Sequence, residues 1–282
     1  MSQASFAHAA KALRKADADR YFATLVLPVD RREGVAALYA FNAEIAAIRE
    51  RVSNPAAGEI RLQWWNDALS GEEHGAVRQN PVADALLGTI AQYQLPVGTL
   101  QRLLGARRFD LYDDPMPDVP TFEGYAGETA STLYQLAAMI VNGGGQVPSG
   151  DAAGHLGVAQ AMIGHLRAFG YHASQSRIML PWSIFAANGV RESEIFSGVE
   201  SEGLHEALGQ ISELAGEHLE KAELAIGAVP AHLRAVFAPV SLLRSQLDAY
   251  QSRGTSPYAA PPLEADWRKI ARLMWWGISR CR

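Results

Sequence analysis

The stretch VAALYAFNAEIAAIRERV, residues 35–52, decides the fold. Its large apolar side chains fall at spacings of three and four residues, at Leu38, Phe41, Ile45, Ile48 and Val52. Such spacing puts them on one face of an α-helix, because the helix repeats every 3.6 residues. Pro28 lies before the stretch and Asn54-Pro55 follows it, and both are typical of helix limits. The sequence therefore predicts a core helix here.

Working outward from this stretch, the same periodicity predicts helices along most of the chain. They are expected at 58–69, 81–94, 97–111, 125–141, 153–169, 204–226 and 231–252. Segments rich in proline, glycine or aspartate separate some of them, at 113–120, 142–150 and 252–262. The sequence contains no convincing β-alternation and no repeat. We therefore predict an all-α protein, a single large helical bundle that forms one domain over residues 1–282.

The composition narrows the range of partners and of cellular locations. The formal net charge of −5 at pH 7 gives no reason to expect nucleic acid. The single cysteine, Cys281, excludes a disulfide framework and a cysteine-rich zinc site. No run approaches the roughly 18 apolar residues of a membrane span, and the N-terminus has no apolar core for secretion. We expect a cytoplasmic protein, with attachment at the periphery of the inner membrane as an addition.

The final segment, 267–282, combines aromatic, apolar and basic residues. Trp267, Ile270, Met274 and Ile278 form an apolar stripe, to which Trp275 and Trp276 add aromatic area, and Arg268 and Arg272 lie off it. This pattern is typical of an amphipathic helix that lies in a membrane interface. A terminal helix docked on the bundle has the same pattern, and this second reading is the one we favour.

Three stretches together resemble the squalene/phytoene synthase family. They are RYFATLVLPVDRREGVAALYAFNAEI at 20–45, RLQWWNDAL at 61–69 and LGVAQAMIGHLRAFGYHASQSRIMLP at 156–181. Their order and separation match those of the family over most of the chain. The resemblance implies a bundle of the isoprenoid (terpenoid) synthase type around a central cavity. It also implies an ancestry of enzymes that join two prenyl diphosphates head to head, with magnesium held by two aspartate-rich motifs.

The aspartates of those motifs are missing here. The first motif falls on Ala46, Ala47 and Glu50, and the second on Ala168 and His172. Mg²⁺ prefers hard oxygen ligands, which alanine does not offer, and histidine is a poor substitute. We therefore expect no catalytic residues, no metal site and no cofactor at these positions. The closest resemblance is to a divergent branch of the family that includes the mitochondrial assembly factor for respiratory complex I. It rests on Ala40-Phe41-Asn42, Gln63-Trp64-Trp65 and Tyr171-His172.

Several residues remain candidates for binding a substrate or ligand. They are Tyr39, Asn42, Glu50, Trp64, Arg167 and His172. Arg167 is the strongest of them, because it matches a family motif position and an arginine can grip a diphosphate without metal. Glu50 has the alternative of a solvated residue near a helix end, and one or both of Trp64 and Trp65 are expected in the core. The pair Arg107 and Arg108 is expected in surface ion pairs.

Two further clusters offer weaker metal sites. His165 and His172 lie seven residues apart, on one helix face, and with Glu50 would suit zinc or iron. Two hydrogen-bonded histidines lining a cavity are the simpler reading. Asp110, Asp113 and Asp114 form an acidic cluster, but Pro115 indicates that the backbone has left the helix by Asp114.

The sequence thus leads to one main hypothesis and two alternatives. The main one is a non-catalytic family member that assists respiratory complex I assembly, with a subunit of that complex as partner and an isoprenoid or lipid as ligand. The first alternative is an active prenyltransferase of the squalene/phytoene synthase type with atypical diphosphate binding, which would need magnesium. The second is a carrier of lipid or quinone.

Overall fold

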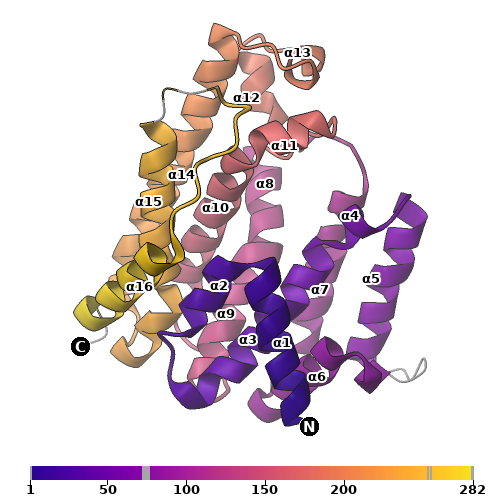
Figure 1. The fold of residues 1–282 in the computed structure, drawn as a ribbon, viewed down its shortest axis with the longest axis vertical. Coiled ribbons are helices and arrows are strands. Elements are labelled where there is room, and N and C mark those ends of the chain that lie inside the picture. Colours follow the sequence, from indigo (N-terminus) through magenta and orange to yellow (C-terminus); the bar gives the residue numbers. More distant parts are fainter. Residues whose placement is uncertain (1, 72–76, 253, 255, 281–282) are drawn as a thin grey trace.

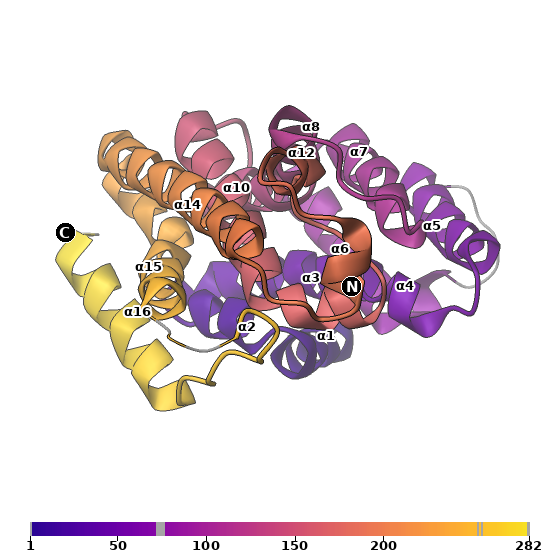
Figure 2. The same ribbon diagram turned by 90° about the horizontal axis from the view of Figure 1, so that it is seen from above.

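The computed structural model describes residues 2–71, 77–252, 254 and 256–280. Every regular element within these residues is helical, so the predicted all-α class is confirmed (Figure 1). The helices α5 and α7 lie at one edge of the molecule, and α14, α15 and α16 at the opposite edge (Figures 1 and 2). Helices α3, α9 and α10 run between the two edges.

The first half of the chain forms a series of short and medium helices. Their bounds are α1 (Gln3–Ala16), α2 (Ala18–Thr24), α3 (Val29–Ala46), α4 (Ile48–Arg51), α5 (Pro55–Ser70), η1 (Val77–Gln79), α6 (Pro81–Tyr93), α7 (Val97–Arg107) and η2 (Arg108–Leu111). Local sequence sets these limits as predicted: α3 begins directly after Pro28, and Asn54 caps α5 by accepting a hydrogen bond from the Ala57 N–H at 3.0 Å.

The second half contains the longest helices. Their bounds are α8 (Val119–Ala126), η3 (Gly127–Ser131), α9 (Thr132–Val141), α10 (Gly150–Arg167), α11 (Phe169–Ser174), α12 (Trp182–Ala187), α13 (Glu192–Phe196), α14 (Glu202–Ala228), η4 (Ala231–Phe237), α15 (Pro239–Gln251) and α16 (Asp266–Arg280). The helices α10 and α14 pack along each other, and α10 also crosses the π-helical turn η3. Helix α14 lies at the same edge as α15 and α16, and α10 lies between this edge and the other one.

Helix α3 lies at the centre of the packing. It contacts α1, α6 and α9, and the predicted stripe members Leu38, Phe41, Ile45 and Ile48 are buried. One cluster of buried apolar side chains extends from Phe6 to Leu247. Burial of this size supplies the main favourable free energy of folding.

Several of the predicted helices are interrupted in the structure. The helix expected at 35–52 breaks at Ala47, the one at 153–169 breaks at Ala168, and the one at 97–111 ends in the 3₁₀ turn η2. The segment 125–141 contains the π-helical turn η3, which the apolar pattern does not reveal. The segment 231–252 is a 3₁₀-helix followed by α15, which begins at Pro239. Proline lacks a backbone N–H and its ring clashes with the preceding turn, so it begins a new helix instead of continuing the old one.

The chain ends in an extended strap and a final helix. Residues 259–265 have no regular structure, and α16 then packs against α2, α15 and η4. The predicted docking of this segment on the bundle is therefore confirmed for Asp266–Arg280. Cys281 and the end of the predicted helix lie outside the described residues.

Candidate functional site

The two degenerate motif positions lie at two interruptions of helices. Ala46 ends α3 and is exposed, and Ala47 separates α3 from α4 with φ −86° and ψ 1°. Ala168 separates α10 from α11 in the same way, with φ −95° and ψ 8°. The Tyr171 hydroxyl of α11 donates a hydrogen bond to Oε1 of Glu50 in α4 at 3.1 Å. The two motif regions therefore meet in space, although the residues that join them are more than a hundred positions apart.

A buried group centred on Arg107 lies between these regions and the core. Nη1 of Arg107 donates to Oδ2 of Asp110 at 2.9 Å and to the Tyr125 hydroxyl at 2.7 Å, and Nη2 lies 3.4 Å from Oδ1 of Asn42. The Tyr125 hydroxyl donates to Oδ1 of Asp110 at 2.7 Å. The turn η2 explains the pairing, since a 3₁₀-helix stacks side chains three residues apart. Helices α3, α7 and α8 are thus joined by one ion pair and its hydrogen bonds.

The surroundings of this group determine the protonation states of Arg107 and Tyr125. Burial acts to lower the pKa of Arg107, but Tyr125 and Asp110 beside it outweigh burial, so the pKa rises above its usual range. Burial also raises the pKa of Tyr125 far above its ordinary value. Arg107 is therefore a cation and Tyr125 a neutral hydrogen-bond donor near pH 7.

Two histidines line the same region. Nδ1 of His165 lies 3.3 Å from Nε2 of His172, which confirms that the two side chains share one face across the break at Ala168. Burial, followed by the nearby His172, lowers the pKa of His165 to about 3, and burial followed by Arg177 lowers that of His172. Both rings are therefore neutral near pH 7. Nδ1 of His172 is buried without a hydrogen-bond partner in the described part of the chain.

An outer ion pair closes the region toward solvent. Nη2 of Arg49 and Nε of Arg177 each lie 3.2 Å from Oδ1 of Asp113. Asp113 follows η2, which ends at Leu111, so the prediction that the backbone has left the helix before Asp114 is confirmed. The Tyr171 and His172 ring centroids lie 5.6 Å apart, and His172 is close enough to Arg177, Asp110 and Glu50 for their charges to act on its pKa, so these groups adjoin one another. We refer to them together as the motif network. It consists of Asn42, Arg49, Glu50, Arg107, Asp110, Asp113, Tyr125, His165, Tyr171, His172 and Arg177.

The motif network does not fit a magnesium ion. Its three arginines balance its three carboxylates, and each carboxylate already has a partner: Arg107 and Tyr125 for Asp110, two arginines for Asp113, and Tyr171 for Glu50. Mg²⁺ needs oxygen ligands in near-octahedral geometry, and here the only carboxylate at a motif position is Glu50. Within residues 2–71, 77–252, 254 and 256–280, no three His, Cys, Asp or Glu side chains are grouped so as to hold a metal ion.

Arg167 faces a different part of the molecule. It lines a pocket of about 270 Å³ with Gln246 of α15, Leu263 of the strap and Arg268 of α16. Burial lowers its pKa, partly offset by Asp19 and Glu264. Its guanidinium makes no hydrogen bond or ion pair in the described part of the chain. The structure thus separates Arg167 from Glu50 and His172, with which the sequence grouped it.

Tyr39 and Trp64 also lie apart from the motif network. Tyr39 is buried, the Arg20 guanidinium lies 5.6 Å from its ring centroid, and burial raises its pKa to about 12. Trp64 lines a cleft of about 220 Å³ beside α5, whereas Trp65 packs edge-on against Phe41 in the core. Of the six predicted binding residues, the structure brings together Asn42, Glu50 and His172 and leaves three in separate places.

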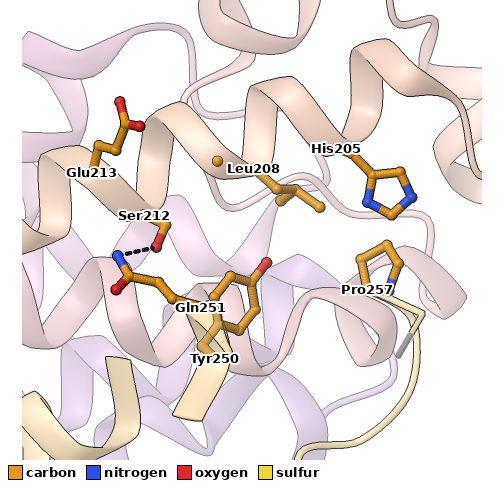
Figure 3. A pocket seen from close by; sticks show the side chains of 8 residues that line it. His205, Leu208, Ser212, Glu213, Tyr250, Gln251 and Pro257 are labelled. Carbon is orange, nitrogen blue, oxygen red and sulfur yellow. Dashed lines mark hydrogen bonds between the residues drawn. The ribbon is translucent and has the colours of Figure 1, made fainter. Parts of the chain in front are cut away.

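A further pocket lies between α14 and the end of α15. It has a volume of about 350 Å³ and is lined by His205, Leu208, Gly209, Ser212, Glu213, Tyr250, Gln251 and Pro257 (Figure 3). Nε2 of Gln251 donates to the Ser212 hydroxyl across its floor at 3.1 Å. None of the residues singled out from the sequence lines this pocket.

Arg107 and Arg108 differ in their surroundings. The predicted surface ion pair is present for Arg108, 3.0 Å from Glu59, but the prediction is wrong for Arg107, whose ion pair with Asp110 is largely buried. Arg107 is largely buried, with its side chain 16% exposed, because α7 ends on it and η2 turns it toward α3. The one available signal was Asp110 three residues later, a spacing that also suits an exposed pair.

Comparisons with known proteins show which family and fold the chain resembles. The model of the family described as "Squalene/phytoene synthase" matches residues 13–270. The chain is 30% identical over 229 residues to human "NADH dehydrogenase (ubiquinone) complex I, assembly factor 6", covering 79% of this chain and 68% of that protein. It is 24% identical over 266 residues to "Phytoene synthase 1, chloroplastic" of Arabidopsis thaliana, covering 90% and 61%.

A solved structure shows the same fold. The crystal structure of a dehydrosqualene synthase in complex with ligand superposes with a TM-score of 0.80 at 20% identity, over 97% of this chain and 95% of that one. The predicted bundle of the isoprenoid synthase type is thereby confirmed.

Proposed function

Because the chain belongs to the squalene/phytoene synthase family, we propose that it is a member without prenyl transfer activity that assists the assembly of respiratory complex I. Its partner would be a subunit of that complex, and its ligand, if it binds one, an isoprenoid or another lipid. The proposal needs no magnesium and no other cofactor. It places the protein in the cytoplasm, with attachment at the periphery of the inner membrane.

The observation that supports loss of catalysis is the neutralised motif network. In head-to-head prenyl transfer, a departing diphosphate must be stabilised by cations. Here Ala46 and Ala168 offer no ligand, and Arg49, Arg107 and Arg177 are already paired with carboxylates. Breaking the largely buried pair of Arg107 and Asp110 to bind a diphosphate would leave its carboxylate unpaired, at a large cost in free energy, whereas the pairs with the exposed Asp113 would cost less to break.

The support for an assembly role comes from the relatives. Human complex I assembly factor 6 is 30% identical to the chain, whereas the phytoene synthase of Arabidopsis thaliana is 24% identical. The similarity to the assembly factor spans 79% of the chain and 68% of that protein.

Product analysis tests the catalytic half of the proposal. The purified chain is incubated with farnesyl or geranylgeranyl diphosphate, magnesium and NADPH, next to an active dehydrosqualene synthase as positive control. We expect no squalene, dehydrosqualene or phytoene by mass spectrometry. A C30 or C40 product above the no-enzyme background would overturn this half and support the alternative of an active synthase with atypical diphosphate binding.

Complex I content tests the other half. In cells that lack the gene, native gels stained for NADH dehydrogenase activity are expected to show loss of assembled complex. The unchanged chain should restore the complex, and so should variants Glu50→Ala and Arg167→Ala, because an assembly role depends on the fold and the partner surface instead of diphosphate contacts. Normal complex I in cells without the gene would contradict the proposal.

A further inference from the structure

The last helix, α16, has two apolar faces, of which the bundle covers one. Ile270, Leu273 and Trp276 point inward, and Leu273 is 1% exposed among Phe22, Ala238 and Leu242. The stripe predicted from the sequence mixed the two faces, since Ile270 was grouped with residues that point outward. Figures 1 and 2 both show α16 on the outside of the molecule.

The second face is open to solvent. Trp267 is 67% exposed, Met274 54%, Trp275 74% and Ile278 52%. With the exposed Ala271, these residues follow one another at spacings of four, three, one and three along α16, so they form a continuous stripe. Leu263, just before the helix, is 90% exposed and extends the stripe. A contiguous apolar surface of this kind usually marks an interaction site.

The helix is basic although the chain is acidic. Asp266–Arg280 contains four cations, Arg268, Lys269, Arg272 and Arg280, against the single anion Asp266. The whole chain has a formal net charge of −5. Arg268 and Arg280 make no ion pair in the described part of the chain and are exposed, and the Arg268 guanidinium lies 5.4 Å from the centroid of the Trp267 ring. Aromatic and apolar residues flanked by arginine suit a surface that is apolar inside and anionic outside.

The position of α16 is fixed before any partner arrives. Nζ of Lys269 lies 2.7 Å from Oδ1 of Asp19, Nη2 of Arg272 lies 2.9 Å from Oε1 of Glu264, and Arg234 donates to the backbone carbonyl of Arg280 at 3.2 Å. These contacts and Leu273 hold the helix on α2, η4 and α15. A preformed surface binds without the entropic cost of ordering a free peptide.

From these observations we propose that the outward face of α16, together with Leu263, binds the surface of a bilayer that contains anionic lipids. The helix would lie in the plane of the interface, with its two exposed tryptophans among the acyl chains, Arg268 beside Trp267 at the phosphates, and Arg280 adding its exposed charge at the end of the helix. A docked helix presents a convex ridge, which a flat deformable bilayer accommodates directly, whereas a protein would need a matching groove. None of the described helices is both long and apolar enough to cross a membrane. This surface deepens the membrane attachment proposed above and rests on it, but vesicle binding and complex I content are measured separately, so either can fail without the other.

Vesicle co-sedimentation of the full chain tests this proposal. Vesicles of phosphatidylcholine alone are compared with vesicles that also contain 30% phosphatidylglycerol, at low and at high salt. We expect binding to the anionic vesicles that weakens as salt rises, with a partition coefficient about tenfold or more above that for neutral vesicles. Lipids brominated on their acyl chains should quench the tryptophan fluorescence.

Two variants assign the binding to this face. Trp267→Ser with Trp275→Ser should lower the partition coefficient by at least about tenfold, and Arg268→Gln with Arg280→Gln by about tenfold on anionic vesicles only. The matched control is Ile60→Ser on α5, which removes a 71% exposed apolar side chain at the opposite edge and should leave binding unchanged. Circular dichroism and the urea midpoint confirm folding, which these exposed positions should not affect.

Three results would overturn the proposal. The first is no binding to anionic vesicles, and the second is a loss of binding in Ile60→Ser equal to that in the tryptophan variant. The third is a dimer in sedimentation analysis that dissociates to monomers when Trp267 and Trp275 are replaced. The last would assign the face to a second copy of the chain.

Discussion

At the scale of single residues, Arg107 shows how one side chain joins three helices. Its guanidinium contacts Asp110, Tyr125 and Asn42, and the side chains of Arg107 and Asp110 are 16% and 15% exposed. A charge in such surroundings is tolerated only while its partner is present. The contribution of Arg107 is therefore best measured together with that of Asp110.

We predict that Arg107→Met lowers the free energy of unfolding by about 3 kcal/mol, because Asp110 is left as a buried carboxylate without its cation. The double variant Arg107→Met with Asp110→Leu should be less destabilised than the single one, since no buried charge then remains. Urea unfolding followed by circular dichroism measures both.

The control for this prediction is the next residue in the chain. Arg108 pairs with Glu59 at 3.0 Å but is 55% exposed, so Arg108→Met should cost less than about 1 kcal/mol. Equal losses for Arg107→Met and Arg108→Met would mean that the buried ion pair contributes no more than a surface one.

The same two residues show what sequence reasoning misses at this scale. The residue types and the spacing to Asp110 are visible in RRFD, but burial depends on α3 and α8, which are distant in the chain. Asn42 and His172, by contrast, were predicted from their match to family motifs and do lie in the motif network. Arg167 matched a motif equally well and faces another pocket, because the break at Ala168 and the strap surround it differently.

At the scale of elements, the crossing of α10 over η3 limits which residues the helices can contain. Gly157 of α10 lies directly over Ser131, the last residue of the π-helical turn, and the Ser131 hydroxyl donates to the backbone carbonyl of Gly154 at 3.0 Å. A π-helical turn inserts an extra residue, which widens the helix and brings its backbone closer to a neighbour. Glycine allows that approach because it has no Cβ.

We predict that Gly157→Ala lowers the free energy of unfolding by about 2–3 kcal/mol, because its Cβ would overlap both the backbone and the side chain of Ser131. Gly164→Ala on the same helix is the control: its Cβ would meet nothing within 4 Å, so this change should stabilise the protein by about 0.5–1 kcal/mol. Thermal and urea unfolding of both variants provide the comparison. A neutral or stabilising Gly157→Ala would show that η3 can move away from α10.

The helices themselves were largely predictable, and their interruptions were only partly so. Apolar spacing located α14, which buries one stripe, and α3, whose residues 34–42 are buried on all sides. Pro239 was visible in the sequence, yet apolar residues on both sides of it gave the appearance of one helix. The π-helical turn at Gly127–Ser131 has no local sequence signal, because packing against α10 and α7 determines it.

At the scale of the whole molecule, the two motif regions come from opposite halves of the chain and face each other only because the bundle closes. Glu50 and Tyr171 are 121 positions apart and share a hydrogen bond of 3.1 Å. A metal site built from both regions therefore depends on the assembled bundle and not on either helix alone. The resemblance to a family could predict this juxtaposition, whereas helical periodicity could not.

We therefore predict that three aspartates suffice to restore a magnesium-dependent response to diphosphate. In Ala46→Asp with Ala168→Asp and His172→Asp, new carboxylates join Glu50 where α3, α4, α10 and α11 meet, so repulsion should lower the urea midpoint without metal. Magnesium with inorganic pyrophosphate should raise the midpoint again, and the free energy of unfolding by about 2.7 kcal/mol at a hundredfold excess over the dissociation constant, because a ligand that binds only the folded state stabilises it. The natural chain and the matched asparagine variant should not respond, because neither has the added charge.

An equal response of the natural chain would show that the paired arginines and carboxylates of the motif network open to bind the anion. No response of the aspartate variant would show that the two regions no longer meet at a distance that one ion can span.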